Sequence, residues 1–164
     1  MSKAKPLVGM GRPLPVLTDP GTLNLETWVR LIRICQKVTR KVERVLEPHG
    51  LTSAQFDVLV TLAQADGIPQ QELSDRLLVT KGNVCGLIDR ASASGWVERR
   101  PDAEDRRVNR LFLTDRGREQ LALVMPEKRR VINSVLESLR PEEIEQMYAF
   151  LGVLDHSLDR VERA

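Results

Sequence analysis

Both ends of the chain carry apolar residues at alternating intervals of three and four, and this spacing restricts the fold more than any other feature. Such spacing places the apolar side chains on one stripe of an α-helix, as in helices that pack along a seam. The stripes predict a homodimer held by Trp28, Leu31, Cys35 and Val38 of the first helix and by Ile144, Met147, Leu151, Leu154 and Leu158 of the last.

The middle of the chain predicts two short helices followed by a β-hairpin. Residues 71–78 and 80–94 have helical apolar spacing, whereas residues 96–100 and 109–113 alternate as β-strands do, on either side of a charged stretch. Two helices, a tight turn and a hairpin form the winged helix-turn-helix pattern, in which the second helix enters the major groove of DNA. We therefore expect a mainly α fold with a small β-hairpin wing (α+β), flanked by N- and C-terminal dimerisation helices.

The second of these helices has glycines where DNA contacts are expected. With its apolar stripe turned inward, Gly82 and Gly86 fall near the outward centre. Glycine in a helix interior costs about 1 kcal/mol relative to alanine, so two outward glycines indicate close approach of another molecule to the backbone. Simple tolerance of exposed glycines is the alternative. Lys81, Asn83 and Arg90 flank this line and are suited to groove or phosphate contacts.

The expected wing is rich in arginine. It carries Arg99, Arg100, Arg106, Arg107 and Arg110, interleaved with acidic residues. A solvated loop can be this charged, so the order of the residues carries more weight than their number. Asp105 stands two residues before Arg107. A carboxylate there is expected to hold an arginine guanidinium extended, so that it enters a narrow minor groove.

Composition argues against several other classes of protein. No apolar run nears the roughly 20 residues that span a bilayer, and the net charge of +2 requires any nucleic-acid surface to come from the local distribution of charge. The two cysteines and two histidines lack metal-ligand spacing, and no nucleophile has a recognisable base. We therefore expect no metal, no cofactor, no membrane association and no enzyme activity.

The sequence also suggests how the chain is organised. We expect a flexible N-terminal tail over residues 1–22, a helical dimerisation region over 23–48 and 115–164, and a winged helix-turn-helix domain over 51–114. Pro126 is expected to kink or split the helix that follows the wing. The proline-bearing tail does not have the pattern of a signal peptide, so we expect a cytoplasmic protein with reduced thiols.

Several short motifs, taken in order, resemble the multiple-antibiotic-resistance regulator (MarR) family. The motifs are QELSDRL at 71–77, TKGNV at 80–84, LIDR at 87–90, GWVER at 95–99, DRR at 105–107 and LTDRG at 113–117. Each motif is weak alone, but their order and spacing are specific. The resemblance runs from about Leu25 to the C-terminus.

The resemblance implies a triangular homodimer that binds a pseudo-palindromic operator in double-stranded DNA, with half-sites roughly 10 base pairs apart. Family members mostly repress transcription, and many release DNA when a small phenolic or lipophilic anion binds between the lobes and the dimer helices. We therefore expect a repressor released by such an effector. The residues that the resemblance assigns to DNA are Arg107 in the minor groove with Asp105 as its holder, Thr80, Lys81 and Asn83 on the recognition helix, and Gln70 and Ser74 on phosphates.

Two other interpretations stay open. A winged helix can be a protein-interaction module, which predicts apolar anchors where this chain has Gly, Asn, Lys and Arg. A redox sensor is the second, because peroxide-sensing relatives pair a first-helix cysteine with tyrosines. The only tyrosine here is Tyr148, so we expect Cys35 to be a buried small hydrophobe. Cys85 lies on a flank of the second helix, with no basic neighbour beyond Lys81.

Overall fold

The computed structural model describes residues 20–77 and 79–161, which divide into two units after Lys37. The first unit is the N-terminal part of α1 (Pro20–Leu46), and the rest of α1 belongs to the second unit. Proline fits the first turn of a helix, where its missing N–H is not needed. The last three residues of the tail expected over 1–22 are therefore helical, and the remainder of that tail lies outside the described residues.

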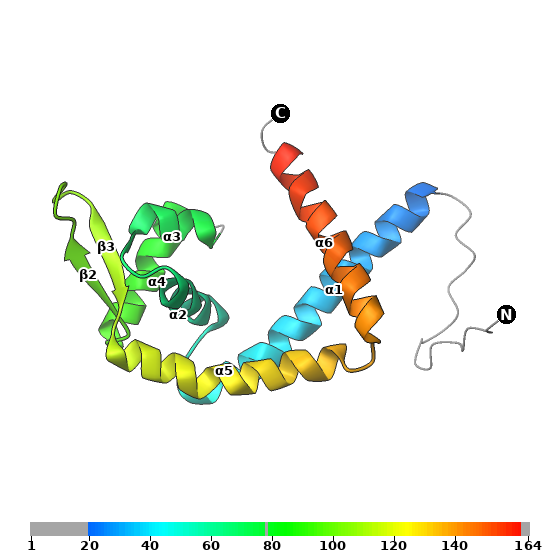
Figure 1. Ribbon diagram of the computed structural model, residues 1–164, viewed down its shortest axis with the longest axis horizontal. Coiled ribbons are helices and arrows are strands. Elements are labelled where there is room, and N and C mark those ends of the chain that lie inside the picture. The colour runs from blue at the N-terminus through cyan, green and yellow to red at the C-terminus, as the bar shows by residue number, and fades with distance from the viewer. Residues whose placement is uncertain (1–19, 78, 162–164) are drawn as a thin grey trace. The chain divides into compact units, whose positions relative to one another are not determined.

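The second unit is mainly helical, with one small sheet, and has the expected fold class (Figure 1). None of the helices in the described part of the chain combines the length and apolarity needed to cross a lipid bilayer. After α1 the elements are the 3-10 turn η1 (Glu47–His49), α2 (Ser53–Gln64), β1 (Ile68–Pro69), α3 (Gln70–Arg76), α4 (Lys81–Ala93), β2 (Val97–Pro101), β3 (Asn109–Leu113), α5 (Asp115–Leu136) and α6 (Pro141–Val161).

Threonine caps begin three helices of this unit. Thr52 forms a capping box with Gln55, in which the Thr52 Oγ1 accepts from the Gln55 backbone N–H and the Gln55 Oε1 accepts from the Thr52 backbone N–H. Thr80 and Thr114 likewise accept the N–H three residues on, at the starts of α4 and α5. Such caps satisfy backbone donors that a helix leaves unpaired, which explains why the helices start at these residues.

The sheet has a third strand that the sequence did not predict. Its order is β1-β3-β2, all antiparallel, with Val97 opposite Leu113 and Ile68 opposite Leu111. The β2–β3 hairpin confirms the expected strands. The extra strand β1 has only two residues and includes Pro69, which is tolerated because β1 is an edge strand.

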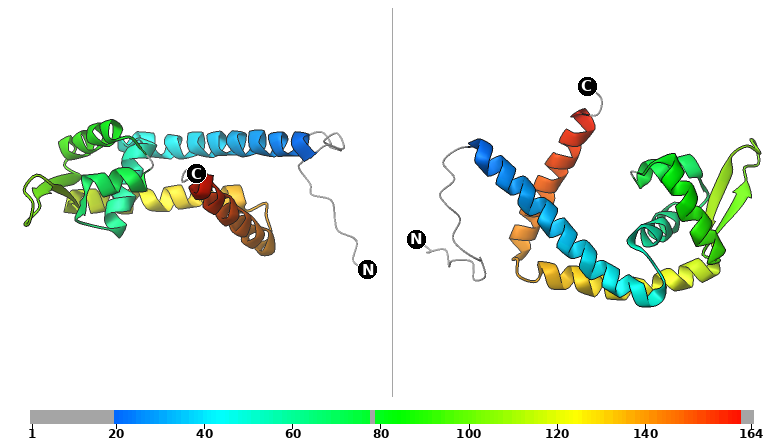
Figure 2. Two further views of the ribbon diagram at one scale, coloured as in Figure 1. Left: turned by 90° about the horizontal axis from the view of Figure 1, so that it is seen from above. Right: turned by 180° about the vertical axis from the view of Figure 1, so that it is seen from behind.

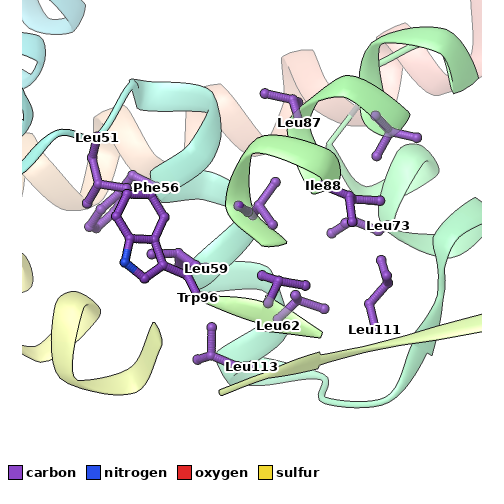
Figure 3. Packing of buried hydrophobic residues seen from close by; sticks show 14 of the residues in the cluster. Leu51, Phe56, Leu59, Leu62, Leu73, Leu87, Ile88, Trp96, Leu111 and Leu113 are labelled. Carbon is purple, nitrogen blue, oxygen red and sulfur yellow. The ribbon is translucent and has the colours of Figure 1, made fainter. Parts of the chain in front are cut away.

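One hydrophobic core joins the helices to the sheet (Figure 3). Fully buried side chains include Leu59 of α2, Leu73 of α3, Ile88 of α4 and Leu111 of β3. Burial of each such side chain stabilises the fold by about 1.5–3 kcal/mol. The core also takes in the end of α1, where the half-buried Val38 packs against it. Val38, predicted to be a dimer contact, thus packs partly within its own chain.

Helix α5 continues through Pro126 without a break, so of the two expected outcomes the split does not occur, and a kink stays a prediction (Figure 2). Pro126 leaves the carbonyl one turn earlier, on Ala122, without its helical donor. Both residues are exposed, so water can bond that carbonyl. Further along α5, Lys128 lies 3.6 Å from Asp57 and 4.1 Å from the ring centre of Phe56, which joins α5 to α2.

Candidate nucleic-acid interface

The turn between α3 and α4 is closed by Ser74. This residue is 2% exposed, its hydroxyl donates to the Val79 carbonyl at 2.6 Å, and its own carbonyl accepts from the Val79 N–H at 3.2 Å. The expectation that Ser74 contacts phosphate was therefore wrong, because the side chain is buried and its hydroxyl is already used within the turn. Ser74 closes the turn between the two helices instead.

Helix α4 begins and ends within one residue of the predicted range 80–94 and has the predicted inner face. Thr80 caps it through a hydrogen bond from the Asn83 N–H at 3.4 Å, and Gly95 follows it with a φ of +73°. A left-handed residue after a helix end is most easily glycine. Buried side chains on the inner face are those of Val84, Leu87, Ile88 and Ala91.

The opposite face of α4 presents small and polar residues. Asn83, Gly82 and Arg90 are exposed, and Gly86 is half-buried. A Cβ on Gly82 would meet nothing within 4 Å, so that side of the helix is open. Lys81 begins the helix, but its side chain lies outside what the structure describes.

Gln70 and Cys85 connect the start of α3 to α4. The Gln70 Nε2 donates to the Cys85 Sγ at 2.8 Å, and Cys85 is exposed. The amide of Gln70 thus lies beside the outward face of α4. A phosphate contact from Gln70 stays a prediction.

The wing folds around a buried carboxylate that sequence reasoning missed. Asp102 is 9% exposed, and its Oδ1 accepts from the backbone N–H groups of Glu104 at 2.8 Å and Asp105 at 3.0 Å. Its Oδ2 pairs with the Arg110 Nε. The hydrogen bond from Asp105, then those from Arg110 and Glu104, lower the pKa of Asp102 to about 2. The available signal was an aspartate at the first position of a tight turn, where this residue is favoured.

Arg110, which pairs with Asp102, also bonds a residue outside the wing. Its Nη1 donates to the carbonyl of Gly67 at 3.0 Å, in the turn between α2 and β1. Gly67 has a φ of +77°, a conformation that favours glycine, and its N–H donates back to the Leu111 carbonyl at 2.8 Å. The base of the wing is therefore joined to the body of the second unit.

Asp105 supports Arg107 differently from the prediction. The Asp105 Oδ1 accepts from the backbone N–H of Arg107 at 2.9 Å, and the Asp105 carbonyl accepts from the Val108 N–H at 2.9 Å. The expected pair of carboxylate and guanidinium was wrong, because an aspartate two residues before an N–H readily bonds that backbone group. Asp105 shapes the turn and leaves the Arg107 side chain free.

The arginines of the wing fall into two groups. Arg99 pairs with Asp89 of α4 at 2.5 Å, and Arg100 pairs with Glu98 and lies 4.4 Å from the ring centre of Phe112. Arg110 pairs with Asp102 as described above. By contrast, Arg106 and Arg107 are exposed at the tip, with no ion pair to any residue in the described ranges.

The predicted dimer residues leave large apolar side chains on the surface of the single chain. In the first unit, Trp28 is 56% exposed and Cys35 is also exposed, so the expected burial of Cys35 does not occur within one chain. In α6, the exposed fraction is 45% for Leu151 and 59% for Leu158. The remaining members of the two stripes are the half-buried Leu31 and Ile144 and the exposed Met147 and Leu154.

A fold with these helices and this wing is a winged helix-turn-helix. A sequence profile described as "MarR family" matches residues 49–108. The HTH-type transcriptional repressor YetL of Bacillus subtilis is 31% identical over 133 residues, which cover 80% of this chain and 80% of YetL. The chain belongs to the MarR family of transcriptional regulators.

Two solved structures show the same fold. A mutant of MarR from Escherichia coli, crystallised in complex with operator DNA, has a TM-score of 0.76 at 25% identity, with 84% of this chain and 99% of that chain covered. CouR from Rhodococcus jostii RHA1, bound to p-coumaroyl-CoA, has a TM-score of 0.68 at 25% identity, with coverage of 76% and 87%.

Proposed function

We propose that this protein is a homodimeric repressor that binds a pseudo-palindromic operator through α4 and the wing. The observation that carries the proposal is the division of the wing arginines. Arg99, Arg100 and Arg110 neutralise acidic partners within the chain, whereas Arg106 and Arg107 extend from the tip without partners in the described residues. Unpaired arginines on a projecting hairpin suit the phosphates and the narrow minor groove of DNA.

The outward face of α4 supports the same function. It offers Gly82, Asn83 and Arg90 to the major groove, whereas a protein-interaction module would need apolar anchors there. The E. coli MarR structure with operator DNA supports DNA as the ligand. We keep Gln70, Thr80, Lys81 and Asp105 in the proposed interface, with Asp105 acting through the backbone, and leave Ser74 out of it.

The proposed dimer uses the apolar stripes of α1 before Val38 and of α6. Side chains as large as Trp28, Leu151 and Leu158 are costly to leave in water, and a second copy of the chain would bury them. The proposed domains are thus a reading head built around residues 51–114 and a dimerisation region at the two ends of the chain.

Regulation by a small molecule completes the proposal. CouR was solved bound to p-coumaroyl-CoA, a phenolic thioester, which supports a phenolic or lipophilic anion as the class of effector.

Regulators of this family are not enzymes, and we propose that this chain has no catalytic activity. A repressor acts where the genome lies, so we propose that it works in the cytoplasm.

The test is a titration of the protein with its own promoter DNA at several salt concentrations. Fluorescence anisotropy of the labelled DNA reports the binding. Binding through 6–10 phosphates lowers the affinity by roughly 10³- to 10⁵-fold between 50 and 200 mM salt. We expect a dependence of this order and a footprint with half-sites about 10 base pairs apart. A weak affinity that does not change with salt would contradict DNA binding.

A further inference from the structure

Gly86 and Arg90 lie one turn apart on α4, and the guanidinium of Arg90 lies over the glycine. A Cβ placed on Gly86 would be 3.4 Å from the Arg90 Nη1 and 4.0 Å from the Arg90 Nη2. The same position on Gly82 meets nothing within 4 Å. Gly86 is accordingly half-buried, whereas Gly82 is exposed. The two outward glycines therefore have different surroundings.

The geometry of a helix explains the position of this guanidinium. Side chains of an α-helix lean towards its N-terminus, so residue 90 covers the surface of residue 86. With no side chain on Gly86, the guanidinium of Arg90 can lie low across the outward centre of α4. A lone Cβ at position 86 would make an ordinary van der Waals contact with the guanidinium, whereas a longer side chain would push it outward or to one side.

The charges around Arg90 leave its guanidinium available to a ligand. Asp89 is the one acidic residue in the sequence of α4, and it pairs with Arg99 of β2 at 2.5 Å. In the described part of the chain, Arg90 has no ion pair of its own. Arg99 thus engages the carboxylate that is next to Arg90 in the sequence.

We propose that Arg90 reads a guanine in each operator half-site and that Gly86 is the residue that positions it. The parallel N–H donors of a guanidinium match the O6 and N7 acceptors that guanine presents in the major groove. The assignment rests on the proposed function. It gives Gly86 the role of positioning Arg90. Close approach of DNA to the helix backbone remains suited to Gly82.

The experiment uses the full chain and an operator selected from random DNA by the wild-type protein. Affinities are then measured for the operator and for versions with each base pair replaced. For Arg90→Ala we expect discrimination at one G·C pair per half-site to fall by about 5- to 150-fold, the factor that corresponds to 1–3 kcal/mol. Arg90→Lys keeps the charge but loses the two parallel donors, so the same base pair should lose discrimination.

Gly86→Leu distinguishes positioning from close approach, because the longer side chain would displace the guanidinium that a lone Cβ would only touch. If Gly86 acts through Arg90, this variant loses discrimination at the same base pair, and in the Arg90→Ala background it causes no further loss. If the glycine serves close approach, it weakens binding to every sequence equally and adds to Arg90→Ala. Gly82→Leu is the matched control, and its effect should not depend on residue 90. Thermal unfolding of each variant checks that it remains folded.

Two results would overturn the assignment. An Arg90→Ala protein that keeps the base preferences of the wild type would remove Arg90 alone from specific recognition. A uniform loss of affinity for all sequences would make Arg90 a phosphate contact. Failure of the wild-type protein to select any sequence would instead overturn the proposed function, and this assignment with it.

Discussion

Gly117 lies directly against the backbone of Trp96. A Cβ on Gly117 would come within 2.2 Å of the Trp96 carbonyl oxygen and 2.8 Å of the Leu113 Cδ1. The same carbonyl accepts hydrogen bonds from the Thr114 N–H at 3.0 Å and the Thr114 hydroxyl at 3.1 Å. The first turn of α5 is thus packed against the start of the wing, with no room for a side chain.

Gly117→Ala should destabilise the fold by about 2–3 kcal/mol, at the upper end of the cost of overpacking, because the obstacle is backbone. The measurement is the midpoint of urea unfolding, compared between proteins whose unfolding free energy has the same dependence on urea concentration. Gly82→Ala is the control, since open space surrounds Gly82 and alanine should raise stability by up to about 1 kcal/mol. Equal stability of the Gly117→Ala protein and the wild type would show that α5 can move away from Trp96.

Arg107→Ala should weaken operator binding without unfolding the protein. Loss of one phosphate or minor-groove contact lowers the slope of log affinity against log salt by about 1. Arg100→Ala is the matched control, because Arg100 is engaged by Glu98 and Phe112 and should leave the slope unchanged. Wild-type affinity in the Arg107→Ala protein would remove the wing tip from the interface.

Asp102→Asn should loosen the wing tip while the core stays folded. The amide keeps the size of the side chain but removes the negative charge. That charge strengthens both the pair with Arg110 and the hydrogen bonds that the carboxylate accepts from two N–H groups. We expect faster amide hydrogen exchange at Glu104 and Asp105, together with weaker operator binding. Unchanged exchange at both amides would count against a structural role for the carboxylate.

The low pKa of Asp102 predicts the pH range over which its carboxylate stabilises the wing. Folding lowers the pKa from 3.8 to about 2, so the ionised carboxylate stabilises the wing fully above about pH 4. Its contribution is lost as the pH falls through 2. A carbon-13 NMR titration of the Asp102 carboxyl should therefore have its midpoint near 2. A midpoint close to 3.8 would mean that the wing network does not form in solution.

Leu151→Glu should convert the proposed dimer into a monomer, because it places a charge in the apolar stripe of α6. Sedimentation equilibrium measures the change, and operator affinity should fall with it because one reading head replaces two. Ala149→Glu is the control, since residue 149 is exposed and lies about 200° away around the helix. A dimeric Leu151→Glu protein, or a monomeric wild type, would contradict this interface.

Features that depend on neighbouring residues were predictable from the sequence. Thr80 and Gly95 mark the ends of α4, and the alternation in 96–100 and 109–113 marks the hairpin, because caps and strand periodicity act over a few residues. The apolar stripe of α4 likewise identified its buried face and, by difference, the outward one.

Features that depend on distant residues were not predictable. Strand β1 exists only because Ile68 and Pro69 meet β3, and two residues carry no periodic signal. The sequence does not show that Ser74 is buried or that its hydroxyl bonds the Val79 carbonyl five residues on. The role of Asp102 needs Arg110 on the opposite strand. Local motifs identified the wing, but they could not say which of its carboxylates and arginines would pair.

The hydrogen bond from Arg110 to the Gly67 carbonyl and the ion pair between Arg99 and Asp89 brace the hairpin against the turn after α2 and against α4. A reading head braced on two sides has little freedom to change its own shape. An inducer of the proposed repressor would then act by changing the distance between the reading heads of the two protomers. Because the DNA groove repeats about every 34 Å, a shift of a few ångströms would leave one head out of register when the other is seated.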